Sequence, residues 1–296
     1  MSPAATNVRR PGELTFERGG LSFRATLDGP PDGPLVILLH GFPGSRRTWH
    51  GVTRRLTDAG VSTATLEQRG YGAAARPAQV ADYRLPELAA DVVALADHLG
   101  GGSCHLVGHD WGGIVAWYLA AMSPSRWSSL TVLSTPHPRA YAAAAVGSDQ
   151  AMRSAYAVAF QLPVIPETLL TIAGGRLLQA SLRSSGLNGV TARQYADNLS
   201  TPAAMRAALN WYRASFRHPS DLRRVGDVAV PTTYVWSTRD TALGRAAAER
   251  TAGHVSATYR FVVLDGVTHW IPETRPARTA ELIIAAMGAD RSSARR

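Results

Sequence analysis

A six-residue stretch near the middle of the chain constrains its fold more than any other part of the sequence. Residues 108–113 read Gly-His-Asp-Trp-Gly-Gly, after an apolar run at residues 104–107 and before a helix-forming run at residues 114–121. A strand, a sharp turn and a helix in this order place the central residue, Asp110, in a strained backbone conformation at the tip of the turn. The glycines around it fit such a turn because they lack a β-carbon.

The identity of the central residue, Asp110, limits the chemistry that this turn can support. A serine at this position needs a base to become nucleophilic, whereas a carboxylate is already an anion at neutral pH. A carboxylate that attacks an ester carbonyl forms an anhydride, which is a poor route to ester hydrolysis. When it attacks a saturated carbon that bears a leaving group, it forms an alkyl ester that water can cleave. Asp110 therefore favours strained or activated C–O and C–halogen bonds and argues against an ordinary esterase.

Strand-like and helical patterns alternate along the chain with short connections, which predicts a doubly wound, mostly parallel α/β sheet with helices on both faces. The pattern contains eight strands: a hairpin of two antiparallel strands at residues 13–28, and single strands at 35–39, 61–66, 104–107, 130–133, 232–236 and 259–264. The expected helices lie at residues 48–59, 85–99, 114–121, from about 243, and at 276–287.

The pattern changes between residues 136 and 218. This stretch has no strand-like run, several helical stretches, and repeated glycine and proline breaks. We interpret it as a helical cap subdomain inserted after the sixth strand. The core domain is then expected to combine residues 1–135 and 219–296.

Two further side chains are predicted to meet Asp110 at one edge of the sheet. Asp240 follows the seventh expected strand and His269 follows the last one. Ligands of open α/β sheets bind at the carboxyl ends of the strands, and nucleophile, acid and histidine occur here in the chain order of the α/β-hydrolases. We predict a triad in which Asp240 orients the imidazole and His269 deprotonates the attacking water. Asp265 is the nearest alternative acid, but it precedes a glycine turn and is interpreted as a loop cap.

An oxyanion hole requires backbone N–H groups where charge develops on the Asp110 carboxylate. The usual donors are the residue after the nucleophile and a residue in the loop after the third strand. In this sequence these residues are Trp111 and Phe42.

Length and composition are those of an ordinary globular protein. The 296 residues suffice for one large α/β domain with an inserted subdomain, and the single cysteine, Cys104, excludes a disulfide framework. Residues 1–10 lack the apolar core of a signal peptide, and no apolar run reaches the roughly 18 residues of a membrane span. We therefore expect a cytoplasmic protein with no membrane partner, as a monomer or homodimer.

The net charge of +9 does not by itself indicate a nucleic-acid partner. All 31 basic residues are arginines, and they are scattered along the chain apart from short pairs. No basic helix with interleaved aromatic residues is present, so we expect no binding to nucleic acid.

Together these motifs resemble the epoxide hydrolases of the α/β-hydrolase fold, over essentially the whole chain. The matching pieces are His-Gly-Phe-Pro at residues 40–43, the stretch at 108–113, the late Asp240 and His269, and two cap segments. One cap segment begins at Tyr156 and reads Tyr-Ala-Val-Ala-Phe-Gln; the other, at residues 210–213, reads Asn-Trp-Tyr-Arg and contains Tyr212.

The resemblance implies a cofactor-independent epoxide hydrolase that forms a vicinal diol through an alkyl ester on Asp110. Two cap tyrosines, Tyr156 and Tyr212, are then expected to hydrogen-bond the epoxide oxygen and protonate it, because an alkoxide is a poor leaving group and a phenol has a pKa near 10. Substrate is expected to contact Phe42, Trp111, Tyr156 and Tyr212. Apolar cap stretches at residues 142–146 and 169–178 suggest a small apolar epoxide, with water as the second substrate. No cluster has the spacing of metal ligands.

Two other functions remain open at this point. A haloalkane dehalogenase has a similar fold and nucleophile, but it needs side-chain N–H donors for the halide, and Phe42 offers none beside Trp111. A fluoroacetate-type dehalogenase does not fit, because it would carry arginine at the Trp111 position and a carboxylate after the sixth strand, where this sequence has neither. A catalytically silent relative would bind a small ligand in the cap pocket without turnover.

Overall fold

The computed structural model describes residues 9–293, so residues 1–8, to which most of the signal-peptide prediction refers, lie outside the described residues. These residues contain one eight-stranded sheet in the order β1-β2-β4-β3-β5-β6-β7-β8. The pairs β1–β2 and β2–β4 are antiparallel and the other five neighbouring pairs are parallel, which confirms the predicted mostly parallel sheet. The strands are β1 (Gly12–Arg18), β2 (Leu21–Asp28), β3 (Leu35–Leu39), β4 (Ser62–Glu67), β5 (Cys104–His109), β6 (Trp127–Leu133), β7 (Thr232–Arg239) and β8 (Tyr259–Thr268).

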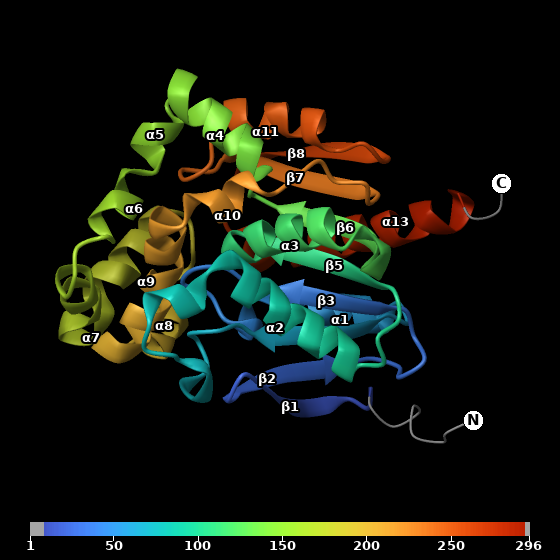
Figure 1. Cartoon of the computed structure of the whole chain (residues 1–296), viewed down its shortest axis with the longest axis horizontal. Coiled ribbons are helices and arrows are strands. Elements are labelled where there is room, and N and C mark those ends of the chain that lie inside the picture. Colours follow the sequence, from blue (N-terminus) through green and yellow to red (C-terminus); the bar gives the residue numbers. More distant parts are fainter. Residues whose placement is uncertain (1–8, 294–296) are drawn as a thin grey trace.

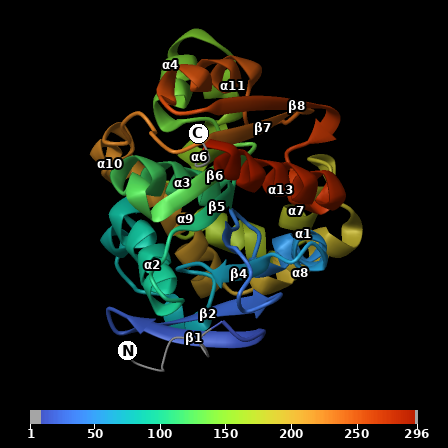
Figure 2. The same ribbon diagram turned by 90° about the vertical axis from the view of Figure 1, so that its right-hand side faces the viewer.

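Helices cover both faces of the sheet, as Figures 1 and 2 show. One face carries α1 (His50–Asp58) and α13 (Pro276–Ser293), and the other carries α2 (Leu85–His98), α3 (Trp111–Met122) and α11 (Arg245–Arg250). The connections add the short helices η2 (Arg46–Trp49), η3 (Ala73–Ala75), η4 (Val80–Tyr83), η5 (Pro124–Arg126), η6 (Thr251–His254) and α12 (Ile271–Thr274).

The central strand β3 is apolar throughout because both of its faces are buried. Val36 and Leu38 pack into the core on the side of α1 and α13, whereas Ile37 and Leu39 pack into the core on the side of α2 and α3. Successive side chains of a strand point to opposite faces, so a strand covered on both sides has no solvent-facing position.

Between β6 and β7 the chain forms only helices, which agrees with the absence of strand-like runs there. They are α4 (Pro138–Gly147), α5 (Gln150–Arg153), α6 (Ala155–Ala159), α7 (Ile165–Ser184), α8 (Gly189–Asn198), α9 (Pro202–Arg217) and α10 (Pro219–Arg223). In Figure 1, α6 to α9 lie beyond one end of the sheet, whereas α4 lies beside α11. Residues 172–175 interrupt α7 with non-helical dihedral angles.

Several elements extend beyond their predicted ends. Strand β7 continues to Arg239 and β8 to Thr268, because the two strands pair again after an irregularity, with Arg239 opposite Thr268. The last helix was expected to end at residue 287 and continues to Ser293. Among the described residues, none of the helices has the length and apolar character needed to cross a membrane.

Candidate active site

Asp110 occupies the sharp turn between β5 and α3. Its φ of 52° and ψ of −124° lie outside the usual region for a residue with a β-carbon. The turn is possible because two neighbours have no side chain. A β-carbon on Gly108 would lie 2.3 Å from the carbonyl oxygen of Gly112, and one on Gly112 would lie 2.2 Å from that of Leu39. The predicted strand, turn and helix are therefore present, with Asp110 at the tip.

The two carboxylate oxygens of Asp110 have different surroundings. Oδ1 accepts a hydrogen bond from the backbone N–H of Phe42 at 2.7 Å, whereas Oδ2 lies 3.6 Å from Nε2 of His269. Oδ1 packs so closely on Gly41 that a β-carbon there would lie 2.2 Å away. Held in this way, the carboxylate keeps one oxygen fixed by the loop after β3 and the other directed toward His269.

The environment of Asp110 favours its charged form. Burial raises the pKa of the carboxyl, but the hydrogen bond and charge of His269, the nearby His109 and the backbone N–H of Trp111 outweigh burial and lower the pKa below its ordinary value. The carboxylate is therefore an anion at neutral pH, as a nucleophile without a separate base must be.

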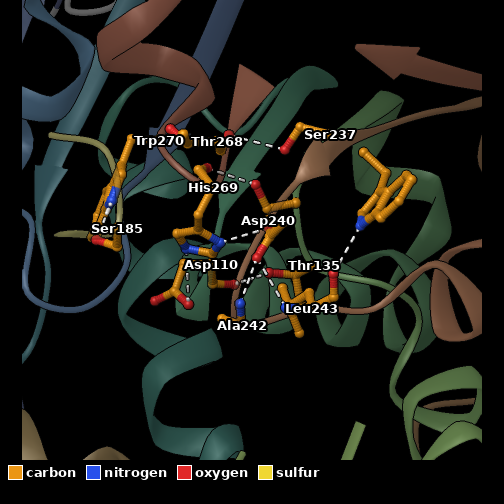
Figure 3. Close-up of polar contacts among 12 residues, drawn as sticks. Asp110, Thr135, Ser185, Ser237, Asp240, Ala242, Leu243, Thr268, His269 and Trp270 are labelled. Carbon is orange, nitrogen blue, oxygen red and sulfur yellow. Dashed lines mark hydrogen bonds and ion pairs between the residues drawn. The ribbon is translucent and has the colours of Figure 1, made fainter. Parts of the chain in front are cut away.

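Asp240 and His269 lie beside Asp110, at the ends of β7 and β8. In Figure 3 the imidazole of His269 lies between the carboxylates of Asp110 and Asp240. Oδ2 of Asp240 accepts a hydrogen bond from Nδ1 of His269 at 2.8 Å, and Oδ1 accepts from the backbone N–H groups of Ala242 and Leu243 at 2.8 and 2.9 Å. The alternative acid, Asp265, instead accepts a hydrogen bond from the Thr238 hydroxyl.

Two carboxylates set the charge of His269. Burial lowers the pKa of its imidazole, but hydrogen bonds and charge interactions with Asp240 and Asp110 outweigh burial and raise the pKa well above the ordinary value. Both carboxylates therefore favour the protonated form of the imidazole. Neutralising either anion would lower this pKa and release His269 toward the neutral form that can act as a base.

The backbone of His269 is held by two side chains from neighbouring strands. Its carbonyl oxygen accepts hydrogen bonds from the Ser134 hydroxyl at 2.8 Å and from Nε2 of His109 at 3.0 Å. Burial lowers the pKa of His109 to about 4, so this ring is neutral and donates through Nε2–H. The side chain of Thr135 likewise donates to the carbonyl oxygen of Asp110 at 2.8 Å. Residues 134 and 135, where no carboxylate occurs, thus support the backbone of the site.

Gln68 braces the loop that presents the N–H of Phe42. Its side-chain amide donates to the carbonyl oxygen of His40, and its backbone N–H donates to Nε2 of His40 at 3.3 Å. His40 is fully buried, as is the following turn into Gly41. The loop that carries the Phe42 N–H is therefore held by Gln68, which follows β4, as well as by its own connection to β3.

The Asn-Trp-Tyr-Arg segment of α9 places Tyr212 between two anchors. Trp211 donates from its indole N–H to the carbonyl oxygen of Arg69 in the core at 2.9 Å. Arg213 donates to the carbonyl oxygens of Phe160 and Leu162 at 3.0 and 2.7 Å. These bonds fix the helix on the core side and the neighbouring cap loop, and Tyr212 between them is buried against the site.

Both predicted tyrosines belong to an aromatic cluster beside Asp110. The ring of Tyr212 lies 5.5 Å from that of Phe42, 4.9 Å from Trp111 and 6.1 Å from Tyr156, centroid to centroid. Tyr212 is buried, whereas Tyr156 keeps 43% of its surface exposed. Desolvation of the hydroxyls, together with the charge of Asp110, raises the pKa of both, so both stay protonated and can donate hydrogen bonds.

Two cavities meet at this cluster, and Asp110, Tyr156 and Tyr212 line both of them. One, of about 360 Å³, continues between α3, α4, α9 and α10 past Ile114, Tyr141 and Leu222. The other, of about 410 Å³, continues toward α7; its lining includes Phe42, His269, Phe160, Leu170, Leu177 and Leu178. Residues 169–178 thus supply cavity walls as expected. Residues 142–146 do not, and Val146 is exposed.

Two residues of α5 that were not predicted from the sequence, Gln150 and Arg153, form hydrogen bonds with the backbone at and after Asp240. Gln150 is fully buried; its amide donates to the carbonyl oxygen of Ala242 at 2.9 Å and accepts from the N–H of Gly244 at 2.8 Å. Arg153 donates to the carbonyl oxygen of Asp240 at 2.8 Å. Their positions in a four-residue helix follow no recognisable motif, because their partners are backbone atoms about 90 residues away.

Within residues 9–293, no three His, Cys, Asp or Glu side chains are grouped so that they could hold a metal ion.

Comparison with known proteins places this geometry in a family. Residues 34–276 match the model of the alpha/beta hydrolase fold family. The chain is 32% identical to the AB hydrolase superfamily protein YfhM of Bacillus subtilis, over 90% of this chain and 94% of that protein. It is 30% identical to epoxide hydrolase A of Mycobacterium tuberculosis, over 93% of this chain and 96% of that protein.

A solved structure, epoxide hydrolase A from Mycobacterium thermoresistibile, superposes with a TM-score of 0.79 at 25% identity, covering 94% of this chain and 98% of the other. The chain therefore belongs to the alpha/beta hydrolase fold family, in the branch that contains these epoxide hydrolases.

Proposed function

We propose that this protein hydrolyses apolar epoxides to vicinal diols through an alkyl ester on Asp110. The observation that carries the proposal is the arrangement of the Asp110 carboxylate. One oxygen is held by the Phe42 N–H, the other faces His269, and both cavities next to it are lined by two protonated tyrosines. Relatives named epoxide hydrolases, at about 30% identity over most of the chain, support the same reaction.

In the first step, Oδ2 of Asp110 attacks one carbon of the epoxide from the side opposite the ring oxygen. A C–O bond forms to the carboxylate and the C–O bond of the strained ring breaks. The departing oxygen takes a proton from the hydroxyl of Tyr156 or Tyr212, so a hydroxyalkyl ester is formed and no free alkoxide leaves.

In the second step, water hydrolyses the ester at its carbonyl carbon. Esterification removes the charge of Asp110, so the pKa of His269 falls and the proton on its Nε2 is released to solvent. The neutral Nε2 then accepts a proton from the attacking water. The N–H groups of Phe42 and Trp111 stabilise the oxyanion on the former Oδ1. The bond between the carbonyl carbon and the diol oxygen then breaks, and His269 gives its proton to that oxygen. The Asp110 carboxyl formed in this step releases its proton, and solvent restores the protons of the tyrosine and of His269.

Epoxide opening fits this site better than release of a halide. A departing halide needs side-chain N–H donors, and Phe42 has none. The indole of Trp111 packs edge-on against the ring of Tyr212, with the ring centroids 4.9 Å apart. A departing epoxide oxygen needs a proton, which two neutral phenols supply.

We also propose that residues 136–218 act as a cap subdomain over a core of residues 1–135 and 219–296. The support is that Tyr156 and Tyr212 approach Asp110 from α6 and α9, whereas Asp110, Asp240 and His269 lie at strand ends of the sheet.

A single turnover in ¹⁸O-labelled water tests the ester mechanism. With enzyme in excess over an apolar epoxide such as styrene oxide, the first diol should carry unlabelled oxygen from Asp110, and ¹⁸O should enter the Asp110 carboxylate. A haloalkane of similar size should release no halide. Label in the first diol would show direct attack by water, and halide release without diol would identify a dehalogenase.

A further inference from the structure

A run of exposed apolar side chains covers the outer side of α6, α7 and the loop between them. Six residues within fifteen positions are each 49% to 61% exposed: Val158, Leu162, Val164, Ile165, Leu169 and Ile172. We call these six residues the apolar strip. Exposed apolar residues on a protein surface are ordinarily scattered, and a concentration of this kind marks a surface that contacts another partner. In Figure 1, α6 and α7 lie at the left edge of the molecule, opposite α13 at the right.

The apolar strip also has no exposed charge. Between residues 154 and 175 the only charged side chain is Glu167, which is buried and paired with Nη1 of Arg213 at 2.7 Å. Long surface segments ordinarily carry charges that keep them in water. The single acid of this segment is instead turned inward.

The apolar strip adjoins an opening of the cavity that leads to Asp110. Tyr156 precedes it in the chain and Leu177 follows it; both line the larger cavity, and both are exposed, by 43% and 53%. Leu170, within the span of the strip, also lines this cavity. A ligand can therefore reach Asp110 from the strip along an apolar path.

The charge around the apolar strip is positive. Residues 136–218 contain eight arginines and three acidic residues, one of which is the buried Glu167. Arg176 and Arg183 follow the uncharged segment on α7, and both are exposed. An apolar surface with an excess of arginine complements an apolar layer covered by anionic groups.

We propose that the apolar strip docks this protein on a lipid surface that carries anionic headgroups. The strip enters the boundary between headgroups and acyl chains, and the cap arginines contact phosphates. A second copy of the chain fits less well, because it would bring two arginine-rich caps together and cover the opening next to Leu177. Docking would deliver apolar molecules from the lipid to the cavity. The contact itself goes beyond the proposed function, since it requires neither Asp110 nor turnover.

Vesicle sedimentation tests this contact. Wild-type protein is mixed with vesicles of phosphatidylcholine alone and with vesicles that also contain phosphatidylglycerol. We expect binding to the anionic vesicles that weakens as salt is added. The double variant Leu162→Ser, Ile165→Ser should bind at least about tenfold less, because it lacks two aliphatic side chains that docking would bury in the lipid.

The matched control is Met122→Ser, Ile284→Ser, which removes two exposed apolar residues from α3 and α13. It should bind as the wild type does, and circular dichroism should show both variants folded. The proposal is overturned if the wild type binds neither kind of vesicle, or if the control loses as much binding as the strip variant. It is also overturned if light scattering without lipid shows a dimer that only the strip variant dissociates. Because no turnover is measured, these results stand apart from any failure of the proposed epoxide chemistry.

Discussion

Among the described residues other than glycine that have a positive φ, Asp110 and Val164 lie in different parts of the molecule, and their surroundings differ. Asp110, at the sheet edge, has a φ of 52°; Val164, in the cap, has a φ of 69°. The conformation of Asp110 is held by hydrogen bonds from Phe42 and Thr135. Val164 is mostly exposed, and within residues 9–293 its polar contacts are the bonds from Thr168 to its carbonyl oxygen.

This difference corresponds to two tasks of the proposed site: the sheet edge carries out the chemistry, and the cap binds the substrate. Strained backbone persists where the surroundings determine it, and at the sheet edge they fix the carboxylate atoms to within hydrogen-bond geometry. The cap contributes apolar walls, two phenols and few polar constraints. We therefore expect substitutions at the sheet edge to remove chemistry, and substitutions in the cap to change rates and substrate choice.

The largest effect is expected at the nucleophile. Asp110→Ala should lower turnover of an epoxide by at least about 10⁴-fold, because no alkyl ester can form. It should also lower the pKa of His269, since removing a nearby anion destabilises the imidazolium; an NMR titration of the imidazole measures this. Unchanged turnover in a folded Asp110→Ala variant would exclude the proposed mechanism.

Next in size is the acid that orients the histidine. Asp240→Asn should lower turnover by about 10³- to 10⁴-fold, because the amide no longer stabilises the imidazolium. Asp265→Asn is the matched control, as this acid lies in the neighbouring strand, β8, and bonds to Thr238 instead of His269. Steady-state assays of both variants separate the two acids; a larger loss for Asp265→Asn would reassign the triad.

Smaller losses are expected for the cap tyrosines. Tyr212→Phe and Tyr156→Phe should each slow ester formation by about 10²-fold, since one phenol can partly replace the other as proton donor. The double variant should lose more than either single variant, while hydrolysis of an ester already formed stays unchanged. Rapid-quench measurement of the two steps checks this, and equal slowing of both steps would argue against proton donation.

The smallest effect is expected at the contact between the two regions. Gln150→Leu removes both bonds to the loop after Asp240 while keeping a side chain of similar size. We expect ester hydrolysis to slow about tenfold, because a displaced Asp240 orients His269 less well. The variant Arg245→Ala, on exposed α11 nearby, is the control. If Gln150→Leu lowers only thermal stability, Gln150 has no positioning role.

Much of the sheet edge could be predicted from the sequence, because each of its functional side chains directly follows a strand that the sequence pattern identifies. Asp110, Asp240 and His269 each follow an apolar strand, and parallel strands end at a common edge, so strand assignment alone brought these side chains together. Phe42 was found in the same way, as a loop residue after β3. The assignment of their roles still depends on the proposed chemistry.

The supporting residues could not be predicted, because their partners are backbone atoms set by the tertiary path. Ser134, Thr135 and Gln150 are ordinary polar residues with no characteristic spacing, yet each holds a backbone group of the site. The cap was also only partly predictable. An apolar helix pattern does not say which side is covered. The stretch at residues 169–178 suggested an apolar substrate; Leu170 and Leu178 line a cavity, whereas Leu169 and Ile172 are exposed.

The intact mass of a His269→Gln variant after exposure to an apolar epoxide tests the central claim most directly. Without the base, ester hydrolysis should stall while ester formation continues, so the protein should gain the mass of one whole epoxide, and peptide mapping should place it on Asp110. Asp110→Ala, His269→Gln should gain nothing. A gain located on another residue, or no gain although the wild type turns the same epoxide over, would contradict the account.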